Sequence, residues 1–167
     1  MERQNRPRLS WRDLIFVNIV LLVIAIDQLS KFWIARHIPL NQVRWDFGIM
    51  RIVHIQNTGA AFGIFQGHTT ALIIVDFIGI LVILFLVFFL RNRWPFINRV
   101  LVLTGIGLIM GGTIGNLIDR LRTGLVTDFI DFKIWPVWNC ADASVTVGVI
   151  ILAYCLLFLA GRSQDRE

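Results

Sequence analysis

Charge is scarce in this 167-residue chain. Only 16% of its residues are Asp, Glu, Lys or Arg, against roughly 25% in a soluble domain, whereas 56% are hydrophobic. Intrinsic disorder requires low hydrophobicity and high charge, so it is excluded. A soluble single-domain enzyme is disfavoured as well, because one core of this size cannot hide so many apolar side chains. The scarcity of charge therefore indicates a membrane protein.

Cysteines and the usual metal-binding and nucleophile motifs are also lacking. The two cysteines, Cys140 and Cys155, are too few for a disulfide framework, and on one helix they would lie too far apart to pair. The three histidines show no H-E-x-x-H spacing, and no Ser/His or Cys/His nucleophile motif is present. We therefore expect neither a metal nor another cofactor.

The basic residues are numerous but scattered. The net charge is +5, and the sequence has a pI near 10.2. Nucleic-acid binding would require a dense basic patch interleaved with aromatic residues, and no stretch of the chain has this character. The Lys and Arg residues instead lie between apolar runs, as they do in the loops of membrane proteins. No nucleic-acid partner is expected.

Four apolar runs are each long enough to cross the ~30 Å hydrocarbon core of a bilayer as a helix. The first follows a basic stretch, as a signal peptide does, but no small-residue cleavage site follows it, so we interpret it as a retained helix. We expect a single polytopic all-α membrane domain over residues 1–167. Its predicted helices are 14–34, 71–90, 100–118 and 143–160, and its outer loops are 35–70 and 119–142.

Lys and Arg are denser in 1–13, 91–99 and 161–167 than in the two long loops. Because positive charge favours the cytoplasmic side, both termini are predicted to be cytoplasmic. Residues 48–57 and 126–132 have the composition of short strands, which predicts a small extracytoplasmic cap containing β-structure. Trp residues near the predicted outer helix ends are typical of interfacial anchors: Trp33, Trp45, Trp135 and Trp138.

Ionisable residues within membrane spans are costly and usually serve a purpose. Asp27 and Lys31 in the first span are four residues apart, so they share a helix face and can pair. The alternative is that Lys31 extends to the interface and Asp27 only compensates its charge. Spacing alone does not decide between these interpretations. Asp76 in the second span has no role that the sequence suggests.

The third span combines small and polar residues. Gly107, Gly111 and Gly115 recur every four residues, a pattern typical of closely packed helices. Polar side chains then share one face at its outer end: Asn116, Asp119 and Arg120. A snorkelling Arg120 does not explain an Asn and an Asp on the same face.

The fourth span begins with Asn139 and Asp142, which on their own could simply cap a helix. Successive spans are antiparallel, however, so Asp119 and Asp142 are predicted at one depth on neighbouring helices. Two carboxylates in contact share a proton, which gives a general acid beside a general base. Such a pair can activate water against a peptide carbonyl, and the sequence does not assign which Asp is the acid.

Five motifs, in this order, resemble the lipoprotein signal peptidase (signal peptidase II) family of bacteria. They are DQLSK (27–31), NTGAAF (57–62), GGTIGNLIDR (111–120), VTDFIDF (126–132) and WNCADAS (138–144). Together they extend over nearly the whole chain. Two departures from the family pattern are Trp138, where Phe is common, and Cys140, where an aliphatic residue is usual.

The resemblance implies an aspartic endopeptidase of the plasma membrane that cuts a prolipoprotein before its diacylglyceryl-modified cysteine. It implies that Asp119 and Asp142 are catalytic, near the outer leaflet. It also implies contact with membrane lipids, and we expect a monomer. The Gly-rich face of the third span could admit the substrate helix. The implied supporting or substrate-binding residues are Asp27, Lys31, Asn57, Gly59, Gly112, Asn116, Arg120, Asn139 and Ala141.

Two other functions compete with this one. A small transporter or proton relay would also carry intramembrane Asp, Asn and Lys, but it would need them throughout the bilayer depth. Here the acidic residues outside the two tails fall in the outer half of the spans or in the outer loops. A structural assembly protein would explain the glycines but not the facing carboxylates. The one-sided placement of acid favours the hydrolase.

Overall fold

The computed structural model describes residues 10–59, 67–90 and 93–159. Residues 60–63, which belong to the first predicted outer loop, lie outside the described residues, as do Ala160 at the end of the fourth predicted span and most of both tails. The elements in chain order are α1 (Trp11–His37), β1 (Val43–Asp46), β2 (Arg51–Asn57), α2 (Thr69–Phe85), the π-helical η2 (Leu86–Leu90), the 3-10 helix η3 (Pro95–Asn98), α3 (Val100–Thr123), β3 (Val126–Asp131) and α4 (Cys140–Leu159).

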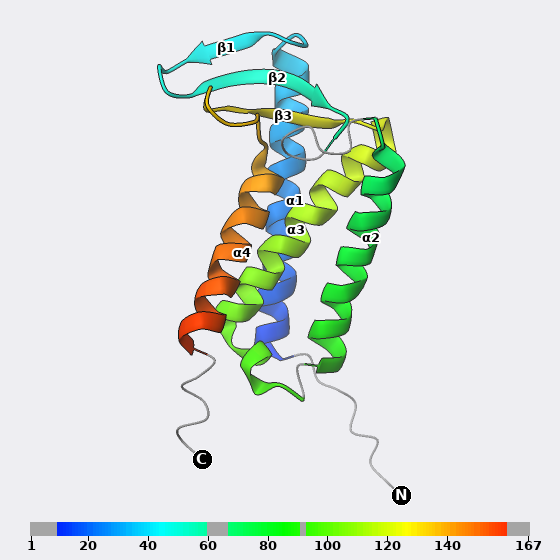
Figure 1. Ribbon diagram of the computed structural model, residues 1–167, viewed down its shortest axis with the longest axis vertical. Helices are drawn as coiled ribbons and strands as arrows, with labels where there is room; N and C mark the ends of the chain where they lie inside the picture. Colours follow the sequence, from blue (N-terminus) through cyan, green and yellow to red (C-terminus); the bar gives the residue numbers. More distant parts are fainter. Residues whose placement is uncertain (1–9, 60–66, 91–92, 160–167) are drawn as a thin grey trace, which may run out of the picture.

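Four of these helices are long and apolar enough to cross a membrane: α1, α2 with η2, α3 and α4. Large apolar side chains cover the outside of the bundle, and Leu29, Phe89 and Leu157 are each more than two-thirds exposed. Such a surface is stable in lipid and unstable in water. A small antiparallel sheet lies across one end of the helices (Figure 1). The predicted fold class, a helical membrane protein with a β-containing cap, is confirmed.

Helix α3 lies at the centre of the bundle and packs against the other three (Figure 1). Its glycines allow this close approach. A Cβ placed on Gly111 would lie 2.7 Å from the Cβ of Val23 on α1, and one on Gly112 would collide with the Ala141 carbonyl of α4. The repeated glycines are therefore a packing face, as their spacing predicts. That face is filled by α1, so it does not receive a substrate helix.

The cap is a three-stranded antiparallel sheet in the order β1-β2-β3. Strands β2 and β3 correspond to the two strand-like segments of the sequence, whereas β1 was not predicted. The register places Asn57 opposite Val126 and Ile55 opposite Asp128. The polar end of β2 thus comes next to the first half of β3, on the side of the cap where α3 ends and α2 begins (Figure 1).

Candidate active site

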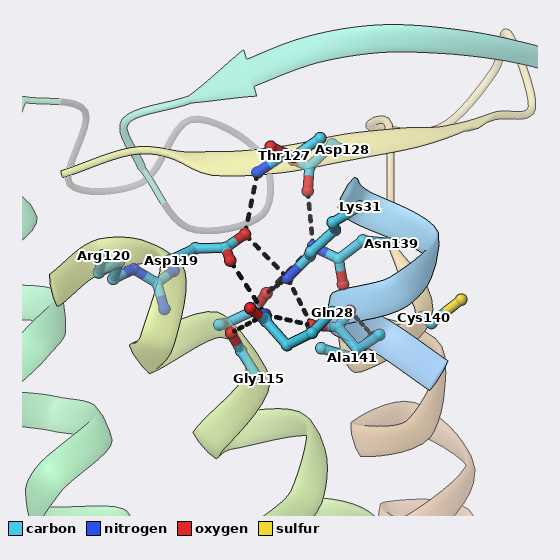
Figure 2. A network of polar contacts seen from close by, with 12 residues as sticks. Gln28, Lys31, Gly115, Asp119, Arg120, Thr127, Asp128, Asn139, Cys140 and Ala141 are labelled. Atoms are coloured by element: carbon cyan, nitrogen blue, oxygen red, sulfur yellow. Dashed lines mark hydrogen bonds and ion pairs between the residues drawn. The ribbon is translucent and has the colours of Figure 1, made fainter. Parts of the chain in front are cut away.

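A buried lysine connects three polar side chains at the sheet end of the bundle. Lys31 is 4% exposed, and its Nζ lies 2.8 Å from Asp27 Oδ2 and 3.1 Å from Asp119 Oδ2. It also donates a 2.9 Å hydrogen bond to Asn116 Oδ1, so α1 and α3 are joined through one ammonium group (Figure 2). The predicted pairing of Asp27 with Lys31 is confirmed, and the burial of Lys31 excludes snorkelling.

Asp27 carries the connection from α1 on to α4. Its side chain is fully buried, and Oδ1 accepts a 2.9 Å hydrogen bond from the backbone N–H of Ala141. Gly115 makes room for this carboxylate, since a Cβ there would lie 2.6 Å from Asp27 Oδ2. Gln28, which the sequence did not single out as a site residue, donates to Asp119 Oδ1 at 3.0 Å. Figure 2 shows Asp119 reaching from α3 toward Lys31 and Gln28.

Two asparagines extend the network toward two further carboxylates. Asn116 donates to Asp142 Oδ1 at 2.8 Å, while its oxygen accepts from Lys31 and from Asn139 Nδ2. Asn139, which is fully buried, also donates to Asp128 Oδ1 at 2.7 Å. Both amides therefore have fixed orientations, and together they bridge Asp128 and Asp142.

The start of α4 is a reciprocal capping arrangement. The backbone N–H of Asp142 donates to Asn139 Oδ1 at 2.9 Å, and the backbone N–H of Asn139 donates to Asp142 Oδ2 at 3.3 Å. Asp142 therefore does contribute to a helix cap, as the simpler interpretation of the sequence supposed. The same carboxylate accepts from Asn116 through Oδ1, so capping and site geometry are combined in one side chain.

Asp128 projects from β3 into the same region. It is 2% exposed and accepts a 3.0 Å hydrogen bond from Asn57 Nδ2 as well as the bond from Asn139. Burial and, to a smaller extent, the nearby charge of Asp142 raise the pKa of Asp128 to about 7, against the lowering effect of the hydrogen bonds from Asn57 and Asn139. Sequence reasoning did not propose Asp128 as a site residue. The sequence did hold one signal for it: Asp128 is two residues after Val126, so its carboxylate lies on the same, apolar side of the strand, where a charged group is unusual.

A cavity of about 470 Å³ opens beside the carboxylates of Asp128 and Asp142. It is lined from four sides by α2, α3, α4 and β3 with the segment that follows it. Its polar wall consists of Asn57, Asp76, Thr113, Asn116, Arg120, Asp128, Asp142 and Thr146, and its apolar wall includes Leu72, Val75, Val126, Trp135, Val137, Trp138 and Val145. Gly59 also lines it and donates its backbone N–H to Asn57 Oδ1 at 2.8 Å.

Asp119 is not among the residues that line this cavity. The structure brings Asp142 together with Asp128, while Asp119 faces Lys31 on the α1 side of α3. Asp119 and Arg120 are consecutive residues, about 100° apart around the helix, so they leave α3 on either side of Asn116. The sequence prediction placed Asp119 and Asp142 at one depth, but depth does not fix the direction in which a helical side chain points.

Asp76 and Arg120 form an ion pair in the cavity wall. Arg120 Nη1 lies 2.8 Å from Asp76 Oδ2, and both side chains are largely buried. This gives Asp76, which the sequence left unassigned, a partner on the neighbouring helix. The remaining predicted supporting residues, Gly112 and Ala141, act through backbone packing between α3 and α4.

The described residues include no cluster of three or more His, Cys, Asp or Glu side chains that could hold a metal ion. What the cavity does offer is two carboxylates linked by fixed amide donors and exposed to its interior. An ionised carboxylate can take a proton from water, and a protonated one can give a proton to a leaving group. The fold and the site together define a helical membrane enzyme with acid–base groups at one end of its bundle.

Comparison with known proteins agrees with this class. The family model described as signal peptidase (SPase) II matches residues 19–158. Proteins named lipoprotein signal peptidase are 44% identical in Dehalococcoides mccartyi strain 195 (89% of this chain, 91% of the relative) and 40% identical in Moorella thermoacetica (91% and 98%). A structure titled as a bacterial membrane enzyme, solved in meso at 2.3 Å, superposes with a TM-score of 0.77 at 30% identity and covers 91% of each chain. The chain belongs to the signal peptidase II family and is a multi-pass peptidase of a bacterial membrane.

Proposed function

We propose that this chain removes the signal peptide from diacylglyceryl-modified prolipoproteins by hydrolysing the bond before the lipidated cysteine. Membership of the signal peptidase II family supports the removal of signal peptides from prolipoproteins. The observation that carries the chemical part of the proposal is the pair of carboxylates, Asp128 and Asp142, in the wall of one cavity between membrane-spanning helices.

In this proposal Asp128 and Asp142 form the acid–base pair, in place of the Asp119–Asp142 pair expected from the sequence. Asp128 has a pKa raised to about 7, which suits a group that holds a proton at neutral pH. Asp142 accepts hydrogen bonds from Asn116 and from the backbone N–H of Asn139, and these two donors hold its carboxylate in place at the cavity wall. Asp119 acts indirectly, by holding Lys31 beside Asn116.

The reaction needs a water between the carboxylates and the scissile carbonyl. Asp142 takes one proton from this water while the water oxygen attacks the carbonyl carbon. Asp128 then gives its proton to the peptide nitrogen as the peptide bond breaks. The products are the signal peptide carboxylic acid, which keeps the second proton of the water until it ionises in solvent, and the neutral amine of the lipidated cysteine. The proton on Asp142 then returns to Asp128.

The position of the cavity suits such a substrate. Its apolar wall, which includes Leu72, Val75 and Val145 on α2 and α4, can contact an apolar signal segment while the acyl chains remain in lipid. We propose that both termini are cytoplasmic and that the cavity lies near the outer leaflet. We also propose that the protein acts as a monomer, since all the proposed site residues belong to one chain.

Incubation of the purified protein with a synthetic diacylglyceryl prolipoprotein peptide, without added metal, tests this function. We expect mass spectrometry to find one cut, immediately before the modified cysteine. The matched unlipidated peptide should be cut poorly. Cleavage at another bond, or equal cleavage of both peptides, would contradict the proposed substrate, and an intact lipidated peptide would contradict the activity.

A further inference from the structure

The acid–base pair does not use the ion pair between Asp76 and Arg120, although both residues line the same cavity. Asp76 lies on α2 and Arg120 on the last turn of α3, with 16% and 10% of their side chains exposed. An aspartate in a membrane-spanning helix is costly, and an apolar pair would hold two helices together at less cost. The pair therefore calls for an explanation other than packing.

The guanidinium group has more donors than Asp76 uses. Arginine carries five N–H groups in a rigid plane, and within the described part of the chain its recorded side-chain bond is the one from Nη1 to Asp76 Oδ2. The single contact through Nη1 anchors one corner of the guanidinium and so limits how the group can turn, and its other N–H groups are left at the cavity wall.

Helix α2 has a second polar attachment near this pair. Thr69 Oγ1, at the start of α2, donates a 2.9 Å hydrogen bond to the carbonyl of Gly124, just beyond the end of α3. This contact holds the same two elements without involving Arg120. Asp76 could serve to attach α2 to α3 or to orient Arg120. Removing the Thr69 contact weakens only the attachment, so it distinguishes these two roles.

We propose that Asp76 is a positioning residue that orients Arg120 so that its free N–H groups bind carbonyl oxygens of the peptide in the cavity. The proposal rests on the function proposed above; the resemblance already implies that Arg120 is a supporting or substrate-binding residue, and what is new is the role of Asp76 in orienting it. A guanidinium group suits this task because it donates two parallel hydrogen bonds and stays ionised at all working pH values.

Equilibrium binding of a fluorescent diacylglyceryl-cysteinyl signal peptide tests the proposal. All variants are made in an Asp142→Asn background, so that cleavage does not interfere. We expect Asp76→Asn to raise the Kd about tenfold, which is the effect of weakening one charge-assisted hydrogen bond. Asp76→Glu, which keeps the charge, should retain most of the affinity. Arg120→Gln should raise the Kd as well, and adding Asp76→Asn to it should have little further effect.

Two controls make the result specific. Thr69→Ala removes the other attachment of α2 and should leave the Kd within about twofold, and so should Asp46→Asn, which breaks an exposed ion pair with Lys133 in the cap. An unchanged Kd in Asp76→Asn would overturn the proposal. Equal weakening by Thr69→Ala, or additive effects of the Asp76 and Arg120 changes, would do so too.

The unmodified protein, tested for cleavage of the same peptide, separates this inference from the proposed function. Binding without cleavage would contradict the proposed hydrolytic activity, while the ratios of the Kd values would still decide the role of Asp76. Cleavage together with an unchanged Kd in Asp76→Asn would remove only the role of Asp76. A protein that neither binds nor cuts the peptide would overturn both.

Discussion

The replacement of Asp128 by Asn is the change that most directly examines the proposed acid–base pair. Asn has almost the same volume, and its oxygen can still accept from Asn57 or Asn139, so the fold should survive. It carries no proton that it can give to a leaving amine. Loss of one general acid or base costs about 100- to 10,000-fold in rate. We therefore expect cleavage of the lipidated peptide to fall by at least about 100-fold.

The raised pKa of Asp128 also predicts how strongly the cleavage rate depends on pH. With a pKa of about 7, about nine-tenths of the Asp128 carboxyls are protonated at pH 6 and about one-tenth at pH 8. If the reaction needs this proton, the rate falls about tenfold from pH 6 to pH 8. An ordinary aspartate, with its pKa near 3.8, would already be ionised over this whole range.

The assay is the initial rate of signal peptide release, followed by mass spectrometry from pH 5 to pH 9. Thermal unfolding in detergent checks that each variant is folded, and Asp46→Asn serves as the matched control because its carboxylate lies in the exposed cap. A folded Asp128→Asn protein that cuts at the parent rate would refute the reasoning. If Asp119→Asn were inactive at the same time, the pair would be Asp119 and Asp142 after all.

Three further predictions follow from the network. Asp119→Asn should slow cleavage by about tenfold in the same rate assay, which is less than the effect of Asp128→Asn, because Asp119 contacts Lys31 and does not line the cavity. A larger loss of rate in Asp119→Asn than in Asp128→Asn would contradict this order. Lys31→Met should destabilise the protein by about 3–5 kcal/mol in thermal unfolding, since it leaves Asp27 without its buried partner, and Asp27→Asn in the same chain should restore part of the loss. Gly115→Ala should lower the unfolding temperature by displacing Asp27, whereas Gly79→Ala on α2, where a Cβ meets nothing within 4 Å, should not; equal effects would remove the steric argument.

Local spacing was informative wherever one element determined the answer. The four-residue separation of Asp27 and Lys31 on one helix offered their ion pair as one of two interpretations, and the glycine repeat predicted close helix packing, which the structure shows to be with α1. Strand-like composition identified β2 and β3. Strand β1 was missed because it is only four residues long: its VRWD sequence does alternate, but so short a run does not distinguish a strand from a loop, and all four residues are exposed.

Relations between elements were harder to infer. Asp119 and Asp142 were paired because antiparallel spans place them at one depth, but the rotation of α3 about its axis is set by the glycines packed against α1. That rotation turns Asp119 toward Lys31 and Arg120 toward α2. Asp128 reaches the cavity because the pairing of β3 with β2 places it beside Asn57. No residue close to Asp128 in the sequence reveals this.

The sequence by itself determined that the protein is a membrane protein with four spans and that the acidic residues outside its two tails lie toward one end, because hydrophobic run length and the cost of buried charge are local properties. Only the tertiary structure decided which carboxylates share a cavity. Helix rotation and strand register arise from packing between distant segments. A rotation of one residue on a helix turns a side chain by about 100°, enough to move an aspartate from the cavity wall to a buried lysine.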